Sequence, residues 1–140
     1  MPDRATGDRF CTVVNCMDGR VQRPVNRFLR ERFGVPFVDT ITEPGPVRLL
    51  AAADGVPETL AGRLRISLEA HGSVGVAVAA HPDCAGNPVP DARQREQLAA
   101  AVRVLAAAVP DRPVLGLWVA LDGAVTVVAA APEGGEEGTP

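Results

Sequence analysis

VGVAVAAHPDC, residues 74–84, carries the strongest structural signal in this 140-residue chain. Residues 74–80 form a short apolar run, which is typical of a strand buried on both faces of a parallel sheet. The run ends at His81, and the Pro82 turn brings the chain to Cys84. Because ligands bind beyond the carboxyl ends of such strands, this segment predicts a site at the end of a buried strand.

Strands and helices alternate on both sides of this segment. The apolar pattern predicts further strands at 10–15, 37–42, 113–120 and 124–129. It predicts helices from Pro24 to a stop at Gly34, around 47–53, from 58 to 71, and over 91–108. This order predicts a three-layer α/β fold. A central, mostly parallel sheet of about five strands would have an antiparallel edge strand last and helices on both faces.

The length and composition predict one globular domain over residues 10–130, with an N-terminal tail at 1–9 and a disordered tail at 131–140. The net charge of -3 argues against a sequence-independent grip on nucleic acid. No apolar run approaches the roughly 20 residues that cross a bilayer, and the first residues lack the apolar centre of a signal peptide. We therefore expect a cytoplasmic protein with reduced thiols and neither nucleic-acid nor membrane partners.

The three cysteines cannot all pair within one chain, so their positions decide their roles. If the first and third strands are neighbours, Cys16 faces the same crevice as His81 and Cys84. Two thiolates and an imidazole suit zinc and leave a fourth ligand position open. The alternative is that Cys16 and Cys84 are ordinary buried cysteines. Cys11, inside the first strand, is expected to be a core residue.

Two short motifs resemble the zinc signature of the β-class carbonic anhydrases: Cys16-Met17-Asp18-Gly19-Arg20 and His81-Pro82-Asp83-Cys84. The resemblance extends over roughly residues 10–130. It implies a carbonate dehydratase in which a zinc-bound hydroxide reversibly hydrates carbon dioxide to bicarbonate. It also implies a homodimer or higher homo-oligomer. The implied roles are one Zn²⁺ per chain held by Cys16, His81 and Cys84, with Asp18 and Arg20 as a catalytic dyad.

Several alternatives stay open at this point. The same site could hydrolyse carbonyl sulfide or carbon disulfide, or the chain could be a non-catalytic, zinc-stabilised binding or scaffold module, which its short flanks favour. Asp18 could pair with Arg20 or ligate the zinc itself, or the pair could be a plain surface ion pair. His71, near a predicted helix end, is expected to be structural rather than a proton shuttle. Asp83 is expected to be a turn residue. A thiol redox role is disfavoured because the sequence has no C-x-x-C pair.

Overall fold

The computed structural model describes residues 9–132 and has one five-stranded sheet with the strand order β2-β1-β3-β4-β5. The first four strands are parallel, and the edge strand β5 runs antiparallel to β4. This confirms the predicted α/β class. The strands are β1 (Phe10–Cys16), β2 (Phe37–Glu43), β3 (Val76–Ala80), β4 (Val114–Val119) and β5 (Val125–Ala131).

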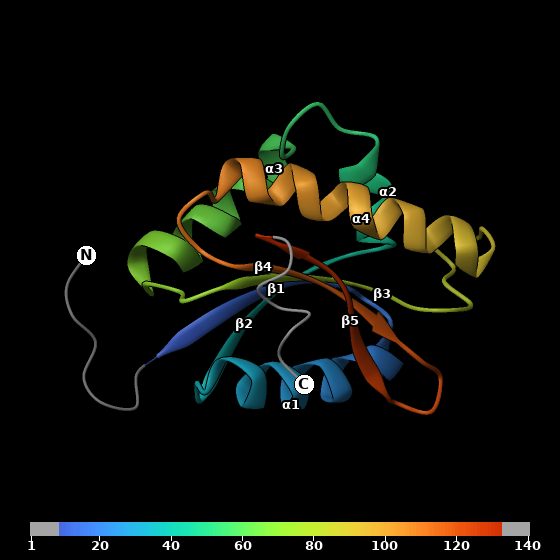
Figure 1. Ribbon diagram of the computed structural model, residues 1–140, viewed down its shortest axis with the longest axis horizontal. Coiled ribbons are helices and arrows are strands. Elements are labelled where there is room, and N and C mark those ends of the chain that lie inside the picture. Colours follow the sequence, from blue (N-terminus) through green and yellow to red (C-terminus); the bar gives the residue numbers. More distant parts are fainter. Residues whose placement is uncertain (1–8, 133–140) are drawn as a thin grey trace.

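Helices cover both faces of the sheet and make three layers (Figure 1). One face carries α1 (Gln22–Phe33), and the other carries α2 (Pro46–Ala51), α3 (Glu58–Arg65) and α4 (Asp91–Ala108). Each interface has its own apolar cluster. Val13 and Leu29 belong to the cluster under α1, whereas Val14 and Leu98 belong to the other. Neighbouring residues of β1 thus enter opposite layers, as the two-residue period of a strand requires.

The first and third strands are neighbours, which is the arrangement that the predicted site assumed. β1 pairs in parallel with β3 from Thr12 opposite Val76 to Val14 opposite Val78. β1 also pairs with β2 along its whole length, so the chain reverses its direction of travel across the sheet between β2 and β3. The loops that follow β1 and β3 therefore leave the same edge of the sheet, side by side.

Two helices depart from their predicted form. α1 begins at Gln22, ahead of Pro24, after a 3₁₀ turn at Gly19–Val21. Proline is tolerated there because the first N–H groups of a helix have no intrahelical partner. The helix predicted over 58–71 is α3 followed by a π-helical turn, Ile66–Ala70, labelled η2.

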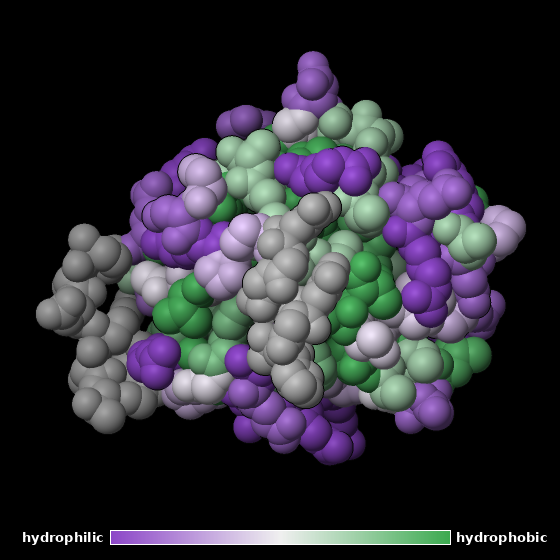
Figure 2. All heavy atoms as spheres, in the orientation of Figure 1, coloured by the Kyte–Doolittle hydropathy of each residue, from purple (hydrophilic) through white to green (hydrophobic). Residues whose placement is uncertain are grey.

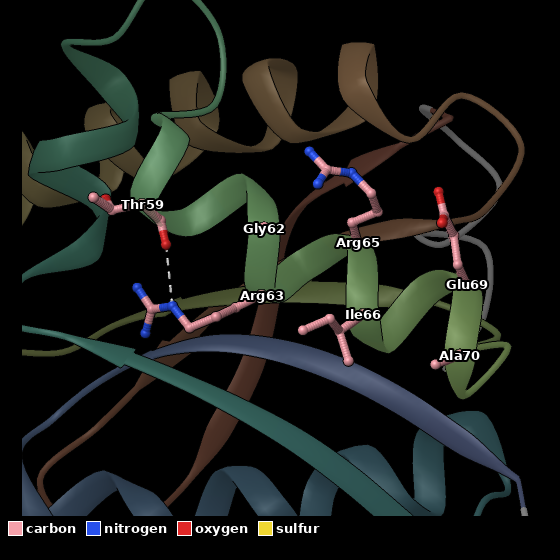
Figure 3. A pocket seen from close by; sticks show the side chains of 7 residues that line it. All are labelled: Thr59, Gly62, Arg63, Arg65, Ile66, Glu69 and Ala70. Carbon is pink, nitrogen blue, oxygen red and sulfur yellow. Dashed lines mark hydrogen bonds between the residues drawn. The ribbon is translucent and has the colours of Figure 1, made fainter.

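The π-helical turn lies next to a polar cluster that joins it to the sheet. Ser67 Oγ donates to Asp39 Oδ2 on β2 at 2.6 Å, and His71 Nδ1 lies 2.5 Å from the same oxygen. A shallow surface depression follows α3 and this turn, where Arg63 Nε donates to the Thr59 carbonyl at 3.1 Å (Figure 3). The irregular turn is thus accompanied by hydrogen bonds to Asp39 on β2. The helical periodicity of the sequence does not indicate these contacts.

The predicted tails at 1–9 and 131–140 lie mostly outside the described residues, which exclude 1–8 and 133–140. β5 continues to Ala131, just past the predicted domain boundary. Among the described residues, no helix combines the length and the apolar character needed to cross a membrane.

Candidate metal centre

Three ligand atoms converge where the loops after β1 and β3 meet. The Cys16 and Cys84 sulfurs and a ring nitrogen of His81 all lie within 4.8 Å of one another, and all three residues are buried. The two sulfurs are 3.8 Å apart. Cys16 is the last residue of β1 and His81 directly follows β3, so the parallel pairing of these strands creates the cluster.

The orientation of His81 leaves one ring nitrogen free for a ligand. His81 Nδ1 lies 2.8 Å from the Pro82 carbonyl oxygen, and because a carbonyl only accepts, Nδ1 carries the proton. His81 Nε2 then offers a lone pair, and it is buried without a hydrogen-bond partner among the described residues. A buried polar atom without a partner is costly. A metal ion beside the two sulfurs would satisfy it, so the donor set fits a metal.

The surroundings of the Cys84 thiol oppose its charged form in the metal-free protein. Burial, and then the nearby Cys16 sulfur, raise the pKa of the Cys84 thiol above its ordinary value of 9.0. Both causes act against a thiolate in the metal-free protein. A bound cation would offset both causes, because it stabilises the charged form of each sulfur.

The loop between the ligands is held by close backbone packing. Asp83, between His81 and Cys84, has a φ of 57°, which is uncommon for a residue other than glycine. Gly86 packs against Gly45 in the turn after β2, and a Cβ on Gly45 would lie 2.8 Å from the Gly86 carbonyl atoms. Gln94 Nε2 on α4 donates to the His81 carbonyl at 2.7 Å. The ligand loop is thereby fixed from β2 and from α4.

Asp18 and Arg20 form a tight ion pair beside the cluster. Arg20 Nη2 donates to Asp18 Oδ2 at 2.7 Å, Arg20 Nε donates to Oδ1 at 3.0 Å, and the Arg20 backbone N–H donates to Oδ1 at 2.8 Å. The side-chain hydrogen bonds from Arg20 are the main cause that lowers the pKa of Asp18 to about 2 from its ordinary 3.8. Asp18 is therefore a carboxylate throughout the neutral range.

Arg20 also contacts Asp83, and sequence reasoning missed this. Arg20 Nη1 lies 3.3 Å from Asp83 Oδ2, and Nη2 donates to the Asp83 carbonyl at 3.1 Å. Arg20 thus connects the loop after β1 with the ligand loop after β3. The one sequence feature that could have indicated this contact is the position of the Asp83 carboxylate between two candidate ligands. Sequence reasoning also missed Gln22, whose Nε2 donates to the Cys16 carbonyl at 2.7 Å. No feature of the sequence indicates this contact.

A surface depression of about 450 Å³ opens over this arrangement. Its lining combines the charged pair and the second carboxylate that contacts Arg20 with one of the candidate ligands and three small or apolar residues: Asp18, Arg20, Asp83, Cys84, Ala85, Pro88 and Val89. A small molecule in the depression would contact both the Asp18–Arg20 pair and the edge of the cysteine–histidine cluster.

Cys11 and His71 lie away from the cluster. Cys11 is fully buried, which confirms the core prediction, and burial followed by the charge of Asp39 raises its pKa to about 12. His71 stacks on Phe10 at a ring distance of 4.0 Å. Phe10 begins β1 and Cys16 ends it, about 20 Å further along the strand. His71 therefore has a structural position, with Asp39 as its partner.

A family model matches residues 6–129, and the family is described as "Putative carbonic anhydrase". The chain belongs to this carbonic anhydrase family. The match includes both sequence motifs, the whole of β1 to β4 and most of β5.

Solved structures of β-carbonic anhydrases share the fold of this carbonic anhydrase-family protein. An enzyme from Trichomonas vaginalis is 16% identical, with a TM-score of 0.61 over 91% of this chain and 85% of its own. One from Sordaria macrospora, described as tetrameric, is 9% identical, with a TM-score of 0.60 over 86% of this chain and 81% of its own. One from Streptococcus mutans is 20% identical, with a TM-score of 0.52 over 87% and 82%. No curated protein matches the sequence.

Proposed function

We propose that this protein is a zinc-dependent lyase that reversibly hydrates carbon dioxide to bicarbonate. One observation carries the proposal. The buried cluster of Cys16, His81 and Cys84, with an unpartnered His81 Nε2, lies beside the charged Asp18–Arg20 pair in a chain of the carbonic anhydrase family. A solitary cluster or a solitary ion pair would support much less.

Zinc is the metal that this donor set favours. Sulfur and imidazole ligands suit it, and two tetrahedral bonds of about 2.3 Å would place the sulfurs about 3.8 Å apart. The Cys16 and Cys84 sulfurs are separated by 3.8 Å. Three protein ligands leave one position open. A zinc ion held by these three residues would supply, at the open position, a water of lowered pKa as a source of hydroxide.

The charged pair has a separate task in this proposal. Asp18, ionised at neutral pH, can accept a hydrogen bond from the reacting water and so fix its orientation. Arg20 holds the carboxylate by two side-chain hydrogen bonds, 2.7 Å and 3.0 Å long, which prevents rotation of the Asp18 side chain. Asp83, as a second partner of Arg20, positions the guanidinium from the opposite loop.

We also propose that the protein assembles as a homo-oligomer, a dimer or larger. The support is the shared fold with a β-carbonic anhydrase that is described as tetrameric. Sedimentation equilibrium of the zinc-loaded protein measures this directly. A concentration-independent monomer would contradict the assembly but leave the catalytic proposal in place.

Stopped-flow measurement of carbon dioxide hydration tests the function. The zinc-loaded protein should turn over, and Asp18→Asn should lose about a hundredfold or more of kcat/KM, the range expected for a residue that handles the reacting water. Asp54→Asn, which removes an exposed carboxylate far along the chain, serves as the matched control and should keep full activity.

The negative outcomes separate the competing functions. A zinc-replete, folded protein without carbon dioxide turnover would contradict the proposal. Turnover of carbonyl sulfide or carbon disulfide by the same preparation, again dependent on Asp18, would assign the site to those substrates. Inactivity on all three compounds would favour a zinc-stabilised binding module.

A further inference from the structure

We propose that the solvent face of α1 binds a small anion that carries two or more phosphoryl groups. Three arginines at helical spacing line one surface depression of about 380 Å³ there, together with two amide side chains and a hydroxyl group from β2: Gln22, Arg23, Asn26, Arg27, Arg30 and Thr40. None of the candidate metal ligands lines this depression, although Gln22 also donates to the Cys16 carbonyl, so the inference does not rest on the proposed function.

The helical spacing places the three guanidinium groups in one row. Arg23 and Arg27 are four residues apart and Arg27 and Arg30 are three apart, so they are neighbours on one face of α1. Val25 and Leu29, on the other face, are buried against the sheet. The apolar residues thus fix the rotation of the helix, and the arginine face has to point away from the core.

These three arginines lack a paired carboxylate in the part of the chain that the structure describes, even though Glu31 follows Arg27 by four residues on α1. Within residues 9–132, none of the three arginines of the depression forms an ion pair, whereas arginines elsewhere pair with carboxylates, as in Arg20–Asp18, Arg63–Glu43 and Arg93–Glu96. Glu31, the carboxylate nearest along α1, does not line the depression. Like charges at these spacings repel, and a cation in the first turn opposes the helix dipole. A bound anion would relieve both effects.

The chemistry of the lining selects the class of anion. Guanidinium groups bind phosphoryl oxygens through two parallel hydrogen bonds. Arg30 Nε already donates to Asn26 Oδ1 at 2.9 Å, which leaves the Arg30 Nη groups, the Asn26 Nδ2 group and the Thr40 hydroxyl as donors for a ligand. A volume of about 380 Å³ is at the small end of the range for small-molecule sites, about 300–1,000 Å³. Three positive charges match a diphosphate better than a single phosphate or carboxylate.

The surface favours a compact ligand over a nucleic acid. Hydrophilic side chains gather over α1 at the lower edge of the molecule in Figure 2. The row of arginines is confined to a helix of 12 residues, about 18 Å long. The chain as a whole carries a net charge of -3, which works against a long polyanion.

Titration of the zinc-loaded protein with inorganic diphosphate, followed by ¹H–¹⁵N NMR and calorimetry, tests the site. We expect saturable binding with shifts at the Arg23, Arg27 and Arg30 side chains. Arg27→Gln should weaken binding by about tenfold or more, on the order of one charge-assisted hydrogen bond. Arg65→Gln on α3 removes the same charge from the opposite layer, and it should change the affinity by less than about twofold, since a distant charge is screened.

Four results would overturn the proposal. The first is no diphosphate binding to the folded protein at millimolar concentrations and low salt. The second is shifts confined to residues 81–86, because diphosphate would then be binding at the metal centre. The third is an equal loss in Arg65→Gln and Arg27→Gln, which would mean that net charge alone attracts the anion. Affinity that instead grows with the length of an oligonucleotide would assign the face to nucleic acid.

Discussion

Arg20 lies between two acidic side chains, one on each of the loops that carry the candidate ligands. Asp18 receives the shorter hydrogen bonds and Asp83 the longer ones. The Asp83 side chain is 78% exposed, so its charge is well screened and contributes little to stability. Its effect on function would come from the direction in which it holds the guanidinium.

Asp83→Asn should therefore reduce activity more than stability. We expect a fall of about three- to tenfold in kcat/KM, smaller than for Asp18→Asn, and a change in unfolding free energy within about 0.5 kcal/mol. Stopped-flow assays and urea unfolding of the same preparations provide the two numbers. An unchanged kcat/KM would show that Asp83 is only a turn residue.

The pH dependence of the proposed activity follows from the ligand charges. Two thiolates cancel the formal charge of a zinc ion, so a water in the open position is acidified less than at a site of three neutral histidines. Acid also favours the thiol form of Cys84, whose pKa is raised, and so favours release of the metal. Both effects make activity increase with pH.

We expect kcat to rise from neutral pH towards about pH 9, well above the water pKa of about 7 at the best zinc sites. Asp18 makes no contribution to this rise. Its pKa of about 2 keeps it ionised over the whole range, and its protonation would begin only as the pH falls towards that value. A pH–rate profile measured by stopped flow, flat down to about pH 6, would contradict this reasoning.

Among the structural elements, the turn after β2 and the ligand loop depend on each other through Gly45 and Gly86. Gly45 has a φ of 58°, and a Cβ there would lie 2.8 Å from the Gly86 carbonyl atoms. Gly45→Ala should destabilise the fold by about 2–5 kcal/mol, the sum expected for overpacking and a left-handed backbone. It should also weaken zinc binding because it displaces the ligand loop.

Gly62→Ala on α3 is the matched control. A Cβ at Gly62 meets nothing within 4 Å, so the substitution should stabilise the helix by up to about 1 kcal/mol. Urea unfolding of the two variants measures the difference. Equal stability of the two alanine variants would show that the two loops do not depend on this close approach.

The strands were predictable from the sequence because most of them are short apolar runs, and β2 is a short run rich in β-branched residues, bounded by turn residues. β3, for example, is buried at every position and lies within the predicted run at 74–80. The π-helical turn at Ile66–Ala70 was not predictable from the sequence. Its polar contacts join Ser67, and His71 just after the turn, to Asp39 on β2. Pattern reasoning detects periodicity within a segment, whereas such contacts depend on the packed sheet.

The same distinction applies to the site. The meeting of Cys16, His81 and Cys84 was predictable from two short motifs and the assumption that the first and third strands are neighbours, which the strand order confirms. The partners of Arg20 and the Gln22 and Gln94 hydrogen bonds depend on side-chain directions in the folded loops, which spacing does not specify. The sequence therefore predicted which residues meet, and the structure adds what holds them in place.

For the whole molecule, zinc should act as a stabilising ligand. The candidate ligands come from segments 65 residues or more apart in sequence, Cys16 and the loop at 81–84, so a metal ion would cross-link the two loops. Free zinc at a hundredfold excess over its Kd would add about 2.7 kcal/mol to the stability of the folded state. For a domain of this size, that corresponds to a rise in Tm of about 5–10 °C.

Thermal unfolding with and without a chelator measures this effect. Cys16→Ser should lose the response to zinc, while Cys11→Ser should keep it, although burial of a hydroxyl in the core lowers its baseline Tm. An equal zinc response in Cys16→Ser would place the metal elsewhere on the protein.

The central claim is that one zinc ion is held by two sulfurs and one imidazole where β1 and β3 end. X-ray absorption at the zinc K-edge of protein loaded with one equivalent of metal tests it most directly. The account predicts two sulfur ligands at about 2.3 Å and one nitrogen ligand at about 2.0 Å, with one further light atom. A zinc ion surrounded only by oxygen and nitrogen, or a protein that retains no stoichiometric zinc, would contradict it.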